Sequence, residues 1–310
     1  MAGKVTIVEV GLRDGLQNEA QILEASIRIE FARKLAVAGL KRIELGAFVH
    51  PDWVPQMAHS GLLFDKAHEM QKEKTFPKGV RFSGLVPNEK GMNDALKYRS
   101  EEIAIFAACS ESFSKKNINC TIEESFERFK PVVALAKKNK VKVRGYLSTC
   151  FGCPYEGRVS VKQVAKVTEM MAAMGVFEIS IGDTIGVANP KQVRDILKVL
   201  NKIVPAKKLA GHFHDTRGTA LVNIYEALDQ GLTTFDSSLG GLGGCPYAPG
   251  ALGNVATEDV VYMLDGLGIK TGVDIEKLIE LNQWISSKMN RTLPSRVGKA
   301  GLLKPKGPIL

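Results

Sequence analysis

The sequence predicts an α/β fold, the TIM (β/α)8 barrel, and two observations support this prediction. Short runs rich in β-branched and aromatic residues recur along the chain, and longer segments with helical apolar spacing separate them. This alternation indicates repeated βα units and a parallel sheet. A doubly wound open sheet is the competing arrangement, but no G-x-G-x-x-G motif follows the first run. The closed barrel is therefore favoured.

Eight runs carry the strand signal, which is the number that closes a TIM barrel. They span residues 4–10, 42–48, 80–86, 102–108, 142–148, 177–183, 209–215 and 233–239. Helical periodicity is clearest over residues 27–39, 123–139, 161–175 and 220–231. Several of these helical segments end at a glycine, as helices commonly do.

We expect all 310 residues to form a single catalytic domain. A (β/α)8 barrel of roughly 250 residues is commonly one domain. The barrel is predicted over about residues 4–255 and a helical extension over about 256–290. Residues 291–310, which are rich in proline, glycine and lysine, are predicted to form a flexible tail.

The composition, 45% hydrophobic and 24% charged, is that of an ordinary globular chain. No stretch approaches the ~20 apolar residues of a membrane span. The first residues alternate like a strand and do not form a secretory signal, so we expect a cytoplasmic protein that binds no membrane. The five cysteines are an odd number, which favours thiols over disulfides.

The formal net charge of +9 indicates an anionic partner. A non-catalytic basic barrel that binds RNA or DNA is one alternative. The lysines and arginines are dispersed, however, and no zinc finger or aromatic RNA-binding motif accompanies them. We therefore expect no nucleic-acid partner.

Polar residues gather where the predicted strands end, which is where TIM barrels carry their active sites. These residues are Glu9, Arg13, Asp14, Glu44, Asp183, His212 and His214. In a barrel, all of these strand ends meet at one mouth. The sequence therefore predicts a functional site there.

Each of these residues also has an ordinary structural explanation. Asp14 precedes a glycine and is compatible with a turn, and Asp183 is compatible with a helix cap. Glu44 is compatible with a simple ion pair to Arg13. The two histidines are compatible with core positions bonded to backbone. Their convergence on one mouth favours function over these explanations.

His212 and His214 are two residues apart in a predicted strand, so both imidazoles point to one face. Two imidazoles and a carboxylate leave coordination positions open, and an added amide oxygen suits Mg²⁺ or Mn²⁺ better than zinc. Cys150 and Cys153 have C-x-x-C spacing, but no second ligand pair completes a zinc site. We therefore expect a catalytic Mg²⁺ or Mn²⁺ site.

The segment 241–254 is rich in glycine, so its backbone can approach a ligand closely and move as a lid. Cys245 lies within this segment. A thiol there is placed to act as a proton donor or a nucleophile, and a packing role is the alternative.

Six long blocks resemble the 3-hydroxy-3-methylglutaryl-CoA (HMG-CoA) lyase family, in the family's order and over nearly the whole chain. The blocks are EVGLRDGLQNE, KKNINCTIEESFERF, RGYLSTCFGCPYEG, EISIGDTIG, HFHDTRGTAL and GLGGCPYAPGALGNVATEDVVYML. The resemblance implies a metal-dependent carbon–carbon lyase, of bacterial type, that cleaves HMG-CoA to acetyl-CoA and acetoacetate by retro-Claisen chemistry.

The resemblance also implies roles for the matching residues. The implied ligands of Mg²⁺ or Mn²⁺ are Asp14, His212, His214 and Asn254. Arg13 would lie beside the thioester carbonyl and stabilise the enolate oxygen. Asp14, or a group relayed through it, would take the hydroxyl proton, and Cys245 would protonate the product carbon.

Supporting roles follow from the same resemblance. Glu44 and Asp183 would orient Arg13 or the metal ligands. The substrate would be an acyl-CoA. The basic balance of the chain suits the phosphates of CoA, and Lys115 and Lys116 are the candidates to hold them. We also expect a homodimer or another homo-oligomer. Glu9 and Glu258 are weaker candidates. Glu258 begins a predicted helix, where the helix dipole explains a carboxylate.

Two departures from the family pattern concern specificity. Leu45, Gly46 and Ala47 stand where the family commonly carries small hydroxyl residues, and Arg217 stands where many relatives carry tyrosine. A lyase for a longer 3-hydroxy-3-substituted glutaryl-CoA therefore remains an alternative. A citramalate or isopropylmalate synthase is less favoured, because those chains generally carry an added regulatory domain.

Overall fold

Eight parallel strands close into a barrel in the computed structural model, which describes residues 3–244 and 252–303. Each strand pairs with its neighbour in sequence, and β8 pairs with β1. The strands are β1 (Thr6–Glu9), β2 (Arg42–Ala47), β3 (Arg81–Leu85), β4 (Glu102–Ala108), β5 (Lys142–Ser148), β6 (Glu178–Asp183), β7 (Leu209–Phe213) and β8 (Thr234–Ser237). This is the TIM barrel that the sequence predicts.

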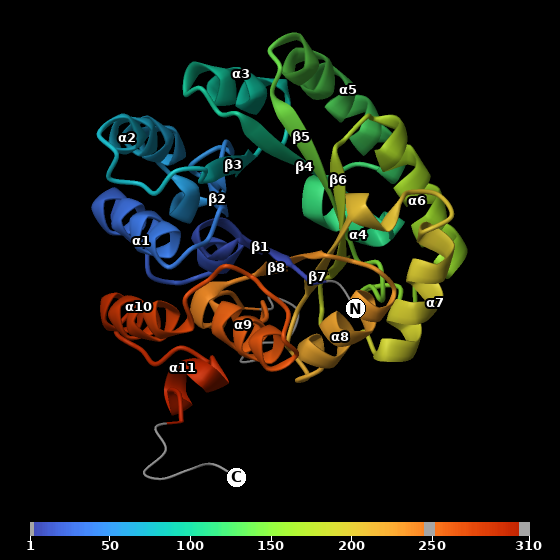
Figure 1. Ribbon diagram of the computed structural model, residues 1–310. Coiled ribbons are helices and arrows are strands. Elements are labelled where there is room, and N and C mark those ends of the chain that lie inside the picture. Colours follow the sequence, from blue (N-terminus) through green and yellow to red (C-terminus); the bar gives the residue numbers. More distant parts are fainter. Residues whose placement is uncertain (1–2, 245–251, 304–310) are drawn as a thin grey trace.

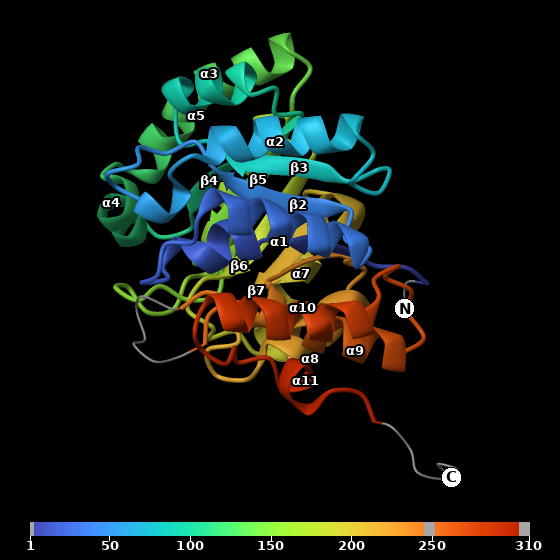
Figure 2. The same cartoon turned by 90° about the vertical axis from the view of Figure 1, so that its left-hand side faces the viewer.

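Helices surround the strands as an outer ring (Figure 1). The main barrel helices are α1 (Ala25–Val37), α2 (Ser60–Lys72), α3 (Glu89–Lys97), α4 (Glu111–Ile118), α5 (Ile122–Lys138), α6 (Val161–Ala173), α7 (Pro190–Leu200) and α8 (Ala220–Asp229). The helix α4 follows β4 directly and lies beyond the strands at one end of the barrel (Figure 2). That end is the mouth, where the carboxyl ends of the strands meet.

The predicted strand boundaries lie within two residues of those of the structure, and the difference at the seventh strand has a physical cause. The predicted seventh strand, 209–215, ends in the structure at Phe213 because the next residue leaves the sheet. His214 instead forms an antiparallel bridge with Asn254. The chain after β8 is thereby tied to the end of β7, directly over the mouth.

Three helices follow the barrel: α9 (Thr257–Gly266), α10 (Ile275–Lys288) and α11 (Arg296–Ala300). The helix α10 packs beside α1, and α11 packs against α9 and α10. Residues 296–300, within the predicted tail, thus form a helix. Arg296 pairs with Asp215 just beyond β7, with Nη1 2.9 Å from Oδ2.

The barrel interior contains a series of ion pairs in addition to apolar side chains. Arg144 on β5 is only 1% exposed and donates to Glu178 on β6 and to Asp236 on β8. Arg42 on β2 continues the series by pairing with Glu178 and Glu102. A charge is costly to bury unless it is paired and hydrogen-bonded, and these charges alternate in sign. The interior therefore holds a polar layer beneath the mouth.

Within the described residues, no helix is long and apolar enough to cross a membrane. The four described cysteines are buried, free thiols. Sγ of Cys109 lies 3.6 Å from Sγ of Cys150, while Cys153 accepts a hydrogen bond from Ser110. The thiols expected at the C-x-x-C pair are therefore present, packed in the protein interior.

Candidate metal centre and active site

The sequence GLRDG forms a single π-helical turn, η1 (Gly11–Gly15), immediately after β1. Both of its glycines are needed for close packing. A Cβ at Gly11 would lie 2.5 Å from Glu9 Oε1, and one at Gly15 would lie 2.7 Å from Ser238 Oγ. The tight turn presents Arg13 and Asp14 side by side at the mouth.

Asp14, His212 and His214 converge on one point. Each offers a ligand atom, and these atoms lie within 4.8 Å of one another. Nε2 of each histidine is 3.8 Å from Oδ2 of Asp14, and the two imidazole centroids are 5.2 Å apart. The two-residue spacing therefore does place both imidazoles on one face, toward the carboxylate. No other cluster of this kind occurs among residues 3–244 and 252–303.

Asn254 also belongs to this cluster. Its Nδ2 donates to Oδ2 of Asp14 at 2.8 Å and its backbone bridges to His214. The two ends of a side-chain amide are assigned from their hydrogen bonds, and turning the amide over would present Oδ1 to the same point. The described residues thus bring together all four ligands that the family resemblance implies.

Arg13 is held between two carboxylates. Its Nε donates to Glu44 and its Nη1 to Asp14, both at 2.6 Å. The guanidinium carbon also lies 5.3 Å from the ring centroid of Tyr146, a cation–π arrangement. Burial opposes the charge, but Glu44 and Asp14 outweigh it and raise the pKa of Arg13. Arg13 is therefore a permanent, oriented cation.

The two carboxylates beside Arg13 differ in environment. Burial would raise the pKa of Asp14, but the charge of Arg13 and contacts with both histidines hold that pKa well below its usual range. Glu44 is fully buried, and this burial raises its pKa even though Arg13 acts in the opposite direction. Asp14 is thus an ionised, ligand-type carboxylate, and Glu44 is a buried anchor for the arginine.

Asp183 lies at the end of β6, where its carboxylate binds backbone. It accepts from the N–H groups of Val187 and Ala188 at 2.9 and 3.0 Å. Burial raises its pKa, partly offset by these bonds and by the charges of His212 and His214. These contacts fit the structural explanation, in which the carboxylate caps the turn that follows β6. No hydrogen bond from Asp183 to Arg13 or to the cluster of Asp14, His212 and His214 is described.

Glu9 and Glu258 are bound to the turn after β8 by hydrogen bonds. Glu9 accepts from the backbone N–H groups of Gly11 and Leu239 and from the hydroxyl of Thr257. Glu258 accepts from the N–H of Gly240 and from a side-chain amide. The expectation that the helix dipole alone explains Glu258 is wrong, because this residue is fully buried and bonded to the turn.

Of the remaining sequence candidates, three are exposed and one lies outside the described residues. Lys115 and Lys116 are exposed on α4, on the mouth side of the barrel. Arg217 is exposed and donates to the carbonyls of Ile185 and Gly186. Cys245 lies outside the described residues.

The segment Leu45, Gly46 and Ala47 ends β2 and is fully buried at Leu45. A Cβ at Gly46 would lie 2.4 Å from Oγ of Ser60, the first residue of α2. Oγ of Ser60 also accepts from the backbone N–H of Ala47 at 3.2 Å. This part of the strand therefore packs tightly against α2, which leaves no room for a side chain at Gly46.

Sequence reasoning missed three polar residues inside the barrel: Arg144, Tyr146 and Asp236. Asp236 Oδ2 lies 3.2 Å from Nδ1 of His212, and Tyr146 packs edge-on against the same imidazole. The available signal was polar residues two apart within predicted strands, as in the run that contains Arg144 and Tyr146. Such alternation marks one face of a strand.

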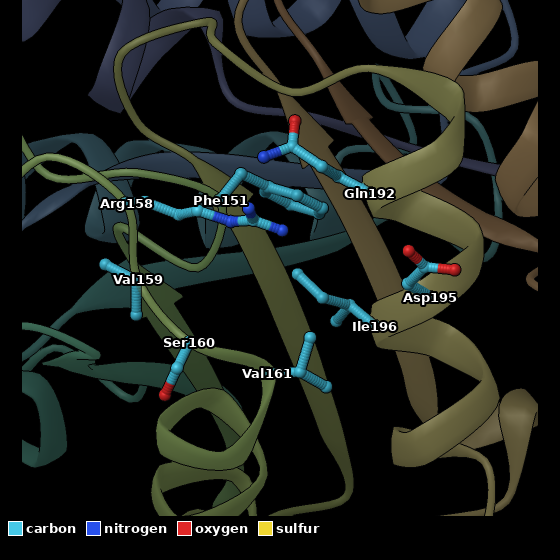
Figure 3. A pocket seen from close by; sticks show the side chains of 8 residues that line it. All are labelled: Phe151, Arg158, Val159, Ser160, Val161, Gln192, Asp195 and Ile196. Atoms are coloured by element: carbon cyan, nitrogen blue, oxygen red, sulfur yellow. The ribbon is translucent and has the colours of Figure 1, made fainter.

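A separate groove lies between the segment after β5 and the helix α7 (Figure 3). One part has a volume of about 270 Å³ and an adjoining part about 560 Å³. Its lining includes Phe151, Arg158 and Gln192. Phe151 packs against Phe213, which lies between the two histidines and so points away from them. The groove therefore lies outside the ring of strands and apart from the cluster of Asp14, His212 and His214.

The model of the family described as HMGL-like matches residues 4–285. The chain belongs to the HMGL-like family. A Pseudomonas aeruginosa relative named 3-hydroxy-3-isohexenylglutaryl-CoA/hydroxymethylglutaryl-CoA lyase is 49% identical and covers 97% of this chain and 98% of its own.

Solved structures of HMGL-like family members have the same fold. A crystal structure of hydroxymethylglutaryl-CoA lyase from Pseudomonas aeruginosa matches with a TM-score of 0.92 and 48% identity, covering 97% of this chain and 98% of the other. An HMG-CoA lyase from Acinetobacter baumannii, in complex with coenzyme A and 3-methylmalate, matches with a TM-score of 0.91 and 34% identity. That match covers 99% of this chain and 98% of the other.

The buried Glu9 predicts a measurable dependence of stability on pH. Burial raises its pKa from the ordinary 4.5 to about 7, against the three hydrogen bonds that it accepts. Between these pH values the folded state binds a proton that the unfolded state has lost, so stability falls as pH rises from about 4.5 to 7. The Glu9→Gln variant can keep both backbone bonds and donate to Thr257. Its free energy of unfolding should therefore gain on wild type by about 3 kcal/mol between pH 4.5 and 8.

Urea unfolding at both pH values measures this difference. The exposed Glu127→Gln variant is the control and should follow wild type at each pH. Parallel pH curves for wild type and Glu9→Gln would show that Glu9 titrates normally in the folded protein.

Proposed function

We propose that this protein is a divalent-metal-dependent lyase that cleaves HMG-CoA to acetyl-CoA and acetoacetate. The observation that carries the proposal is the convergence of Asp14, His212 and His214 beside the oriented cation Arg13. A carbon–carbon lyase of this kind needs a group that activates a hydroxyl and a cation that stabilises an enolate oxygen. The two lie next to each other here.

The relatives support the same substrate. Proteins about as long as this chain and nearly half identical to it are named for hydroxymethylglutaryl-CoA lyase activity. The relative from Pseudomonas aeruginosa is also named for a substrate with a longer isohexenyl group. Neither a lyase restricted to longer substrates nor a citramalate or isopropylmalate synthase is favoured by these names, and HMG-CoA is therefore the substrate that we propose.

The side chains at the cluster fit a hard divalent cation. One carboxylate and two imidazoles converge on one point, and the Asn254 amide is in reach. Three to four such ligands leave positions for substrate, which is the arrangement of a catalytic site. We infer Mg²⁺ or Mn²⁺, with Asp14, His212, His214 and Asn254 as its ligands. When bound, the ion would lower the pKa of the substrate hydroxyl and hold it in place.

In the proposed reaction, residues of the chain transfer the protons and stabilise the charge that develops on the substrate. Asp14, or a group relayed through it, accepts the proton of the tertiary hydroxyl. The bond between C2 and C3 of the substrate then breaks, and the hydroxyl oxygen becomes the ketone oxygen of acetoacetate. The electron pair of the broken bond passes into the thioester and forms an enolate. Arg13 stabilises the resulting enolate oxygen. Cys245 donates a proton to the enolate carbon, which completes acetyl-CoA.

Two further acids support these groups. Glu44 fixes the guanidinium of Arg13 through a 2.6 Å hydrogen bond, so that the cation meets the oxygen in one orientation. Asp183 acts more remotely, by fixing the chain after β6 through two backbone hydrogen bonds. We propose both as positioning residues.

Finer features of the proposal concern partners and location. The Acinetobacter baumannii structure contains coenzyme A, and we propose an acyl-CoA substrate here with Lys115 and Lys116 near its phosphates. We also propose a homodimer or another homo-oligomer, with neither a nucleic-acid nor a membrane partner. The free thiols suit a reducing compartment, and we propose a cytoplasmic location.

Acetoacetate production from HMG-CoA, with added Mg²⁺ or Mn²⁺, tests the proposed reaction. Wild type should be active only with metal, and Asp14→Ala should lose essentially all activity because it removes both a ligand and the proton acceptor. Asp94→Ala, at an exposed position on α3, is the matched control and should retain activity. An inactive wild type that still binds metal would overturn HMG-CoA as the substrate.

The role of Arg13 predicts a specific kinetic effect. Arg13→Gln should lower kcat by about 10²–10³ with little change in KM, because the guanidinium acts on charge that develops during the reaction. Steady-state kinetics with HMG-CoA measures both constants. Arg81→Gln, at the exposed start of β3, is the control. A rise in KM with unchanged kcat would mean that Arg13 only binds substrate.

Cys245→Ser tests the proposed proton donor. A hydroxyl is a far weaker acid than a thiol, so the variant should bind Mn²⁺ as wild type does and lose most of its turnover. Metal titration and steady-state rates separate the two effects, and Cys120→Ser is the control thiol. Full activity in Cys245→Ser would return Cys245 to a packing role.

A further inference from the structure

His212 has different neighbours at its two ring nitrogens. Nδ1 lies 3.2 Å from Oδ2 of Asp236, and Nε2 lies 3.8 Å from Oδ2 of Asp14. The sheet register fixes this arrangement, because His212 on β7 is the direct partner of Asp236 on β8. Neighbouring strands thus present the two side chains at one level inside the barrel.

Asp236 can act only as an acceptor in this environment. It is 1% exposed, and Arg144 donates to both of its oxygens, at 2.7 Å to Oδ1 and 3.2 Å to Oδ2. Ser180 donates to Oδ2 at 2.7 Å. A carboxylate held by a guanidinium and a hydroxyl carries no hydrogen to give. The contact with His212 therefore requires the hydrogen on Nδ1.

We propose that Asp236 is a positioning residue that holds His212 in the tautomer with hydrogen on Nδ1, so that the lone pair of Nε2 faces the Asp14 cluster. The inference rests on the proposed function in one respect, that this cluster binds a metal. A metal needs the lone pair, and a carboxylate behind the ligating imidazole fixes both its tautomer and its orientation. Tyr146 packs edge-on against the ring, with centroids 6.2 Å apart, and restricts its rotation.

A purely structural role for Asp236 is the competing explanation, since it also closes an ion pair inside the barrel. Glu178 is the comparison within this chain. It accepts from the same Arg144, at 2.7 Å, but has no described contact with His212. Removing the charge of Glu178 disturbs the same ion-pair series without touching the imidazole.

The first test needs no variant. Nitrogen-15 NMR of the metal-free, full-length wild type at pH 8 distinguishes protonated from unprotonated ring nitrogens, and the spectrum of His212→Asn identifies the His212 signals. We expect a protonated Nδ1 and an unprotonated Nε2. The opposite tautomer at His212 would overturn the proposal, whatever the substrate of the enzyme.

The second test is Asp236→Asn. Arg144 only donates, so the amide oxygen should face Arg144 and the amide nitrogen should face His212. The amide then donates to Nδ1 and moves the imidazole hydrogen to Nε2. Titration with Mn²⁺, followed by electron paramagnetic resonance of the free ion, should show about a 10–100-fold loss of affinity.

Glu178→Gln is the matched control for this experiment. It should keep the wild-type tautomer of His212 and bind Mn²⁺ within about threefold of wild type. Equal losses in both variants, or wild-type affinity in Asp236→Asn, would make Asp236 a structural residue only. Wild type that binds no Mn²⁺ would count against the proposed metal, and the wild-type tautomer would still decide the role of Asp236.

Discussion

The carboxylate of Asp14 is the interaction on which the mouth of this barrel depends. One oxygen accepts from Arg13 at 2.6 Å, and the other accepts from Asn254 and faces the Nε2 atoms of both histidines. A single side chain thus connects the end of β1, the end of β7 and the chain after β8. Because it keeps 22% of its surface exposed, it can also meet a ligand that enters the mouth. At the mouth, the cation Arg13 thus lies against one oxygen of Asp14, and the two histidines face the other oxygen.

The polar residues inside the barrel, below the mouth, are connected to the same cluster. Buried ion pairs contribute little net stability, because the cost of desolvation offsets their attraction. An apolar layer would fill the barrel at least as well, as it does in many TIM barrels. Here Asp236 and Tyr146 contact His212 directly, and Arg144 in turn holds Asp236. The interior is therefore joined to the cluster at the mouth as well as filling space.

Much of the fold and of the site could be predicted from the sequence, because both depend on local patterns. Strand periodicity predicted eight strands, and the spacing of His212 and His214 placed both imidazoles on one face. The tight turn that presents Arg13 and Asp14 side by side likewise depends on residues adjacent in the sequence. Patterns of this kind need no knowledge of how distant strands pair.

The rest depends on register between strands, which the sequence does not reveal. Asp236 is one acidic residue in a short strand, and only its pairing with His212 distinguishes it from a surface carboxylate. Glu258 sits at a helix start, and only the packing of α9 against the turn after β8 shows that it is buried. Asp183 has the right type and place for the site, yet its hydrogen bonds go to backbone. Side-chain partners across strands are set by tertiary structure.

The most direct measurement of the central claim is a crystal grown with Mn²⁺ and measured near the manganese absorption edge. We expect one strong anomalous peak, bonded to Asp14, His212, His214 and Asn254. A peak at another place, such as the thiols of Cys150 and Cys153, would contradict it. So would a crystal saturated with Mn²⁺ in which Asp14 and the two histidines hold no ion.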